Sequence, residues 1–272
     1  MEKPKLDFGN FRLREQTVIV QAAQVMDTIL ANFHAQRHLR EGFNLRFLMM
    51  QNARLEIQRL IQDRGNDPLS IRDSVYLNMR LNSYYSNLCG ALDNLAWMIS
   101  WELDLLKGLD ESDPASRTFS NLFGRDFLKS LDEHYPELAT LLEEQRDWYL
   151  EVRSLRDPGA HRIPLRFVNS ILKPEEADAS NEAYQRREEY LRLSSQAIEK
   201  GDFKAASEYI DEAATEMERL EGLGKFVPII ATSEASGSRV MSAPDQLRTD
   251  HEILLTISNV VLSAFTSNKH GE

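Results

Sequence analysis

Cysteine is almost absent from this sequence of 272 residues, which contains Cys89 alone. A single cysteine excludes an intrachain disulfide and most cysteine-based metal sites, and it fits a protein of the reducing cytoplasm. Cys89 lies within an apolar helical pattern, so we expect a buried and unreactive thiol. The sequence therefore offers no cysteine chemistry.

Long apolar runs are also missing. No stretch approaches the roughly 18 apolar residues that a membrane-spanning helix requires. The segment 1–7 carries charges with no apolar segment behind them, so we expect no signal peptide. From these two absences we expect a cytoplasmic location and no membrane partner.

The common catalytic signatures are absent as well. The sequence contains no Walker loop, no Rossmann glycine triplet, no His-Glu-x-x-His pair and no Gly-x-Ser-x-Gly elbow. His34 and His38 are four residues apart, so they share a helix face and could bind a metal ion. Two histidines on one amphipathic helix are nevertheless more common than a metal site. We therefore expect no metal and no other cofactor.

Charge is unevenly distributed along the chain. The net charge of −11 argues against a protein that coats nucleic acid, because such proteins are normally basic. Residues 174–221 contain 14 acidic and 6 basic side chains, whereas residues 146–166 contain 5 arginines and 3 acids. The stretch 146–166 is thus locally basic within an acidic protein, and arginine suits phosphate recognition as well as surface ion pairs.

Apolar residues recur at helical spacing through most of the chain. The expected helices cover residues 13–39, 43–63, 71–106, 124–131, 136–152, 181–199, 203–221 and 244–265. Residues 163–168 read as extended, and 225–241 as a β-hairpin that Pro228 restricts to a sheet edge. The fold class is therefore mainly α: an up-and-down helical bundle with an appended acidic helical hairpin and a small β-hairpin near the C-terminus.

The segment 71–106 has the broadest apolar stripe, which predicts a central core helix. Gly90 within it would allow a neighbouring backbone to approach closely. Asp93 and Asn94 are polar residues inside this apolar segment. Either they face solvent or cap a neighbour, or one of them points into a polar site and orients a partner there.

Candidate chemistry is concentrated in residues 145–166. The helical pattern breaks at Asp157-Pro158-Gly159, and Arg156 and His161 flank the break. An arginine followed by a histidine at such spacing is expected by chance in this composition, so the spacing alone carries no argument. The break could start a new helical turn at Asp157, whose free backbone N–H groups favour an anion.

Three further arginines lie near this pair and could bind phosphate: Arg153, Arg162 and Arg166. With a phosphate bound, His161 could activate a ribose 2′-hydroxyl or protonate the leaving oxygen, and Arg156 could stabilise the developing charge. The alternative is a helix-breaking turn in which the arginine and the histidine cap carbonyl groups or pair with Glu151 or Asp157.

The stretch Leu155–Leu165 and the stretch Gly90–Trp97, within a helical layout, resemble uncharacterised bacterial proteins of the HEPN superfamily (higher eukaryotes and prokaryotes nucleotide-binding). The signature of that superfamily is an arginine, usually a polar residue next, and a histidine four to six residues after the arginine. The resemblance implies a dimeric helical bundle and a metal-independent endoribonuclease that leaves 2′,3′-cyclic phosphate ends. Arg156 and His161 would be catalytic, and Asp157 would orient them.

Many members of the superfamily act only as binding or scaffold modules, so the alternative is a non-catalytic module for a nucleotide, an RNA or a protein. The resemblance covers residues 13–168. Residues 174–223 form an acidic hairpin insertion that could act as a lid over the basic stretch, and 225–266 carry the β-hairpin and a helix that packs back on the bundle. Expected partners are RNA or a nucleotide, and a second copy of the chain.

Overall fold

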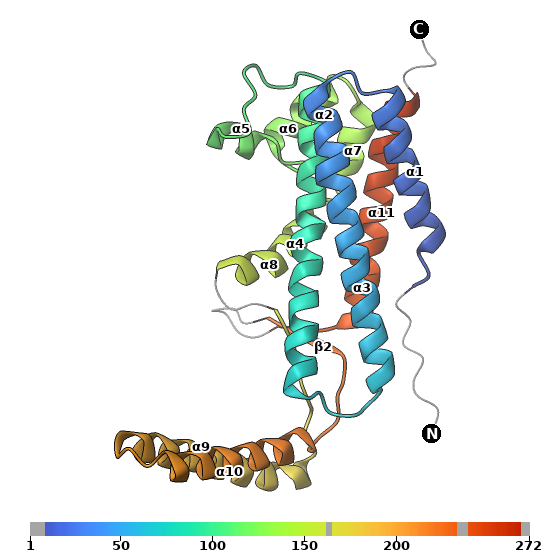
Figure 1. Ribbon diagram of the computed structural model, residues 1–272. Helices are drawn as coiled ribbons and strands as arrows, with labels where there is room; N and C mark the ends of the chain where they lie inside the picture. Colours follow the sequence, from blue (N-terminus) through green and yellow to red (C-terminus); the bar gives the residue numbers. More distant parts are fainter. Residues whose placement is uncertain (1–8, 162–164, 233–238, 268–272) are drawn as a thin grey trace.

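The computed structural model describes residues 9–161, 165–232 and 239–267, and for residues 157–161 and 267 it describes the backbone alone. The chain is mainly α-helical with one small antiparallel sheet, which confirms the expected fold class (Figure 1). Within the described ranges, no helix combines the length and the apolar character needed to cross a membrane.

The N-terminal part contains α1 (Arg12–Thr28), α2 (Phe33–Arg37), the π-helix η1 (His38–Asn44), α3 (Leu45–Arg64) and α4 (Ile71–Glu102). The middle contains α5 (Pro114–Phe119), α6 (Arg125–Asp132), α7 (Pro136–Glu144), α8 (Arg146–His161) and β1 (Arg166–Phe167). The last part contains the 3-10 turn η2 (Pro174–Glu176), α9 (Ala177–Glu199), α10 (Phe203–Glu221), β2 (Ile229–Ala231), β3 (Val240–Ser242) and α11 (Ala243–Ser267).

Helix α4 is the centre of the bundle. Ser70 caps its start by accepting a hydrogen bond from the Asp73 backbone N–H, and the helix continues for 32 residues. Side chains on several sides of α4 are buried, because α2, η1, α3, α8 and α11 all pack against it. Gly90 faces the side chain of Arg46 on α3, not a neighbouring backbone as the sequence suggested. Its missing Cβ leaves room for that guanidinium.

Helix α11 lies alongside α1 and also contacts α4 and α7 (Figure 1). One buried core therefore combines residues from both ends of the described chain. Its polar members include Glu15, Arg54 and His251, which join α1, α3 and α11 inside the bundle.

The small sheet has the strand order β1-β2-β3, with both pairs antiparallel. The expected β-hairpin is present as β2 and β3, but its expected position at an edge is wrong, because β2 is the middle strand. Pro228 lies one residue before β2, so its missing N–H removes no bond from the ladder. Its carbonyl oxygen instead accepts a hydrogen bond from the Ala243 N–H at 2.8 Å.

Helices α9 and α10 form the expected hairpin, joined by a turn in which Gly201 adopts φ = 77°. In Figure 1 the hairpin projects from the end of the bundle where α3 meets α4. Its base is fixed there: Glu221 accepts a hydrogen bond from the Ile71 N–H at 2.9 Å, and Phe226 N–H donates to the carbonyl of Asn66.

Candidate functional site

A polar cavity of about 570 Å³ lies between α4, α8, η1 and the segment 111–121; we call it the α4–α8 pocket. Its lining includes three side chains that the sequence singled out: Asp93, Arg153 and Arg156. It also includes His38, Trp97, Glu111, Arg117 and Tyr149. The pocket thus gathers three arginines, two carboxylates, one imidazole and two aromatic rings.

The wall from α8 carries two of the three arginines. Arg153 and Arg156 are three residues apart and share a helix face, and Tyr149 precedes Arg153 by one turn on that face. The Arg153 guanidinium lies 5.9 Å from the centroid of the Tyr149 ring, a cation–π distance. Burial and then the nearby Asp93 charge raise the pKa of the Tyr149 phenol, so its hydroxyl stays protonated and available as a donor.

The wall from α4 carries Asp93 and Trp97, one helical turn apart. The sequence left open whether Asp93 faces solvent, caps a neighbour or points into a polar site. The structure favours the polar site, because Asp93 lines the pocket that also contains Arg153. Asn94 has a different role. Its side-chain N–H donates to the carbonyl of Gly90 at 2.6 Å, and its Oδ1 lies 3.0 Å from Nδ1 of His38. Asn94 therefore positions another pocket residue.

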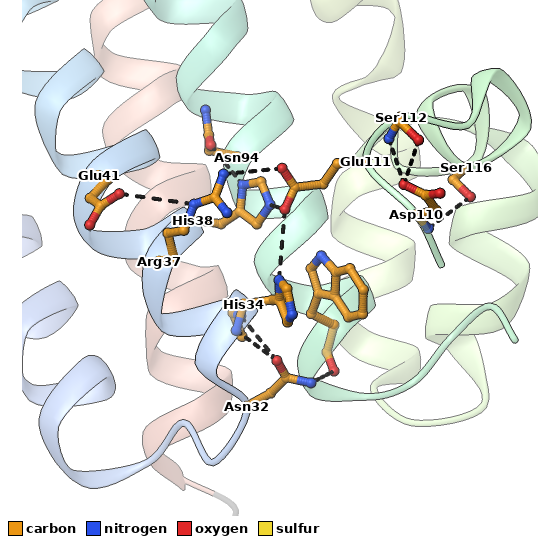
Figure 2. Close-up of polar contacts among 12 residues, drawn as sticks. Asn32, His34, Arg37, His38, Glu41, Asn94, Asp110, Glu111, Ser112 and Ser116 are labelled. Carbon is orange, nitrogen blue, oxygen red and sulfur yellow. Dashed lines mark hydrogen bonds and ion pairs between the residues drawn. The ribbon is translucent and has the colours of Figure 1, made fainter. Parts of the chain in front are cut away.

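His38 is held between two oxygen acceptors (Figure 2). Its Nδ1 faces Oδ1 of Asn94, and its Nε2 lies 3.2 Å from Oε1 of Glu111. Both contacts are hydrogen bonds only when both ring nitrogens carry protons, because neither oxygen can donate to the ring. The ring also stacks on Trp97, with centroids 5.5 Å apart and an interplanar angle of 10°. Asn94, Glu111 and Trp97 together fix the position of the His38 ring.

The π-helix η1 starts at His38, and its glycine, Gly42, packs on Asn94, which holds this histidine. A Cβ on Gly42 would overlap the side-chain amide of Asn94, so only glycine fits without displacing it. π-Helical turns occur often at functional sites. His34 and His38 both approach Glu111, at 3.8 and 3.2 Å, but in the described part of the chain no group of three or more potential ligands could hold a metal ion.

The remaining predicted residues lie in different places. Arg166 is exposed on β1 and does not line the α4–α8 pocket. Asp157 and His161 belong to the last turns of α8, and their side chains lie outside the described part of the structure, as does all of Arg162. Cys89 is buried as expected, although it also borders the pocket.

The expected helix break at Asp157-Pro158-Gly159 is wrong, because α8 continues to His161. Pro158 has no N–H group to donate to the carbonyl of Ser154, so α8 continues past it with one helical hydrogen bond fewer. No new helix begins at Asp157, so the set of free N–H groups expected to attract an anion there is not formed.

The acidic hairpin contributes no described side chain to the α4–α8 pocket. Its base meets α4 at Ile71, which precedes Asp93 by about 33 Å along the helix. The hairpin therefore does not cover the pocket in this structure, contrary to the idea that it acts as a lid.

Helix α8 is anchored by a buried carboxylate. Asp250 of α11 accepts hydrogen bonds from Trp148 Nε1 and Tyr85 Oη at 2.9 Å, and from Gln246 Nε2 at 3.1 Å. Its side chain is fully buried. Burial raises its pKa to about 6, and the hydrogen bonds partly oppose that increase. The first turn of the helix that carries the two arginines is thus tied to the core.

We expect this carboxylate to make stability fall as the pH rises through about 6. Below the unfolded-state pKa of about 4, the Asp250 carboxyl is protonated in both the folded and the unfolded state. Between about pH 4 and pH 6 it stays protonated in the folded state alone, so the folded state binds more protons and is favoured there. The difference in unfolding free energy between wild type and Asp250→Asn should therefore change by up to about 3 kcal/mol from pH 4 to 7. Urea unfolding across this range measures it, and Asp245→Asn, at an exposed residue of α11, is the control. A constant difference would contradict the prediction.

The structure also identifies pocket residues that were not predicted from the sequence: Trp97, Glu111, Arg117 and Tyr149. It adds His38, which the sequence suggested only as a possible metal ligand. Helical spacing could have found two of them, because Trp97 follows Asp93 by four residues and Tyr149 precedes Arg153 by four. The segment 111–121 has no such periodicity, and only the tertiary structure places it here. Comparisons of this chain with protein-family models, with curated proteins and with solved structures found no match.

Proposed function

We propose that the α4–α8 pocket binds an RNA phosphate and that the chain is a metal-independent endoribonuclease of the HEPN type. The observation that carries this proposal is that Arg117, Arg153 and Arg156 line one polar cavity. The planar forks of arginine match phosphate oxygens, and phosphate contacts supply much of the affinity of nucleic-acid complexes. The half-buried ring of Trp97 adds a surface against which a base can stack.

The proposed reaction needs no cofactor. His161 takes the proton of a ribose 2′-hydroxyl, the 2′-oxygen attacks phosphorus, and the bond from phosphorus to the 5′-oxygen breaks. The products are a 2′,3′-cyclic phosphate and a 5′-hydroxyl, whose proton comes from the same imidazole. Arg156 stabilises the charge that develops on the phosphoryl oxygens, and Asp157 orients the pair. Arg153 supports phosphate binding.

The proposal includes a cytoplasmic homodimer that brings two such motifs together, as the resemblance to the HEPN superfamily implies. Arg166, which does not line the α4–α8 pocket, would then contact the RNA outside it, and Arg162 would also bind an RNA phosphate. Asp93 and Asn94 act in support, Asp93 within the pocket and Asn94 through His38.

A non-catalytic binding module is the second candidate, and the two carboxylates favour it. Asp93 and Glu111 line the same pocket as the arginines, and Glu111 also approaches His38. Both acids repel a phosphate diester and would suit a ligand with its own hydrogen-bond donors. Such a pocket could recognise a nucleotide without cleaving it.

The experiment incubates purified protein with a panel of labelled RNAs in EDTA. We expect cleavage products with 2′,3′-cyclic phosphate ends, because the proposed groups act without a metal ion. Acid treatment and phosphatase digestion identify those ends. Binding of RNA or of a nucleotide without any cleavage would support the binding module, and dependence on added Mg²⁺ would contradict the proposed mechanism.

A further inference from the structure

The α9–α10 hairpin buries small side chains between its two helices. The buried positions are Ala183, Ser194, Ala197, Ala206 and Ala213. Ser194 Oγ also donates to the backbone carbonyl of Ala206 at 3.1 Å, which reflects the close approach of the helices. The fully buried positions of the α9–α10 interface therefore carry small side chains, whereas large apolar side chains such as Leu193 and Leu220 are only partly buried.

Five large apolar side chains of the hairpin are exposed, and they form two rows with a spacing of seven residues. The rows are Tyr184, Leu191 and Ile198 on α9, with 56, 36 and 51% of their surface exposed, and Phe203 and Ile210 on α10, with 73 and 51% exposed. Met217 continues the second row and is half-buried. Residues seven apart differ by only about 20° around a helix, so each row is nearly straight. Together the six residues define the hairpin apolar face.

Both rows lie on the same side of the hairpin. On α9, Tyr184 follows the buried Ala183 by one position, a rotation of about 100° away from the helix–helix interface. On α10, Ile210 precedes the buried Ala213 by three positions, which is equivalent to about 60° in the same rotational sense. Because the helices are antiparallel, equal senses of rotation bring the two rows to one face.

The charge around this face is strongly acidic. Residues 177–221 contain 12 acidic and 6 basic side chains. The arginines pair with glutamates of the hairpin itself, as Arg186 does with Glu216 at 3.7 Å. Asp211 and Glu218 directly follow two members of the α10 row. A partner with basic flanks complements this surplus, whereas a second copy of the hairpin would repeat it.

We propose that the hairpin apolar face binds an amphipathic α-helix of a partner protein, with apolar residues at heptad spacing and lysine or arginine on its flanks. The α9 row spans about 21 Å, or three heptad positions, which suits one helix laid along the two rows. The product is a three-helix bundle at the projecting arm seen in Figure 1. This inference does not depend on the proposed nuclease activity.

The test uses the full chain and two synthetic peptides of about three heptads, with leucine at the apolar positions and either lysine or glutamate on the flanks. Fluorescence anisotropy should show binding of the lysine peptide, weakened by salt. Leu191→Glu and Ile210→Glu should each weaken it at least about tenfold. The matched control is Leu48→Glu on α3, where the leucine is 49% exposed, and it should bind like wild type.

Two results would overturn the proposal: equal binding of the glutamate peptide, or undiminished binding by Leu191→Glu. A dimer in light scattering that Leu191→Glu dissociates would assign the face to a second copy and would also overturn it. Circular dichroism checks that each variant keeps its helices. Leu191→Ala is a milder second variant, because alanine favours the helix and removes most of the apolar contact.

Discussion

Replacing Arg156 with alanine should slow RNA cleavage by about 100- to 1,000-fold, because the guanidinium would no longer stabilise the charge of the transition state. Arg156 lies in the α4–α8 pocket with Arg153, so we also expect weaker RNA binding. Arg156→Lys should recover only part of the rate, since an ammonium group keeps the charge and loses the planar fork. Initial rates in EDTA, at saturating and at low RNA concentration, separate the two effects.

The matched control is Arg125→Ala, which removes an exposed arginine from α6 outside the pocket. His161→Ala should abolish cleavage, whereas His134→Ala, at an exposed histidine outside the pocket, should not change it. A wild-type cleavage rate in Arg156→Ala or in His161→Ala would show that the activity does not use this pair. A parallel loss of rate in Arg125→Ala would show that net charge, not the pocket, accounts for the result.

Replacing Glu15 with alanine should lower the free energy of unfolding by about 3–5 kcal/mol, because it leaves a buried charge without its partner. Arg54 is 2% exposed, and its Nη2 donates to Glu15 at 3.0 Å. Its Nε and Nη1 atoms already have no hydrogen-bond partner among the residues that the structure describes. His251 is fully buried and lies 2.8 Å from the same Glu15 oxygen. Chemical unfolding at neutral pH measures the loss.

The double variant Glu15→Leu/Arg54→Met should recover most of that stability, since apolar residues often replace a buried ion pair without loss. Glu144→Ala, at an exposed site, is the control. Burial opposes ionisation of Glu15, but the His251 hydrogen bond and the Arg54 charge together lower its pKa. A lowered pKa stabilises the fold above the unfolded-state value, and this contribution is lost as the pH falls through the folded-state value. A double variant as unstable as Glu15→Ala would contradict this account.

Local patterns in the sequence predicted where the helices lie better than they predicted which helices pack against one another. The hairpin arms 181–199 and 203–221 correspond closely to α9 and α10, because helical periodicity, Gly201 and the capping Asp202 are all local signals. The same local reasoning failed at Pro158, where packing of the preceding turns outweighs one helix-breaking residue. Periodicity also could not show that α11 packs on α1, since that contact joins distant parts of the chain.

The candidate site was predictable only where it follows helix spacing. Arg153 and Arg156 were found from local charge, and Asp93 from its polar character within an apolar helix. Glu111 was missed because a segment without periodicity brings it to His38. The role of Asn94 likewise depends on the close approach of Gly42, which no pattern in α4 can reveal.

The packing of α11 on α1 determines the order in which the molecule can be assembled during synthesis. The bond from His251 to Glu15 spans 236 residues, and the bond from Trp148 to Asp250 spans 102. Contacts of such long range form late, because the intervening chain must first be ordered. The α9–α10 hairpin, by contrast, pairs two helices that follow each other directly in the sequence. On the ribosome its two helices can therefore pair before the bundle is complete, and α8 gains its buried anchor only after the last helix has emerged.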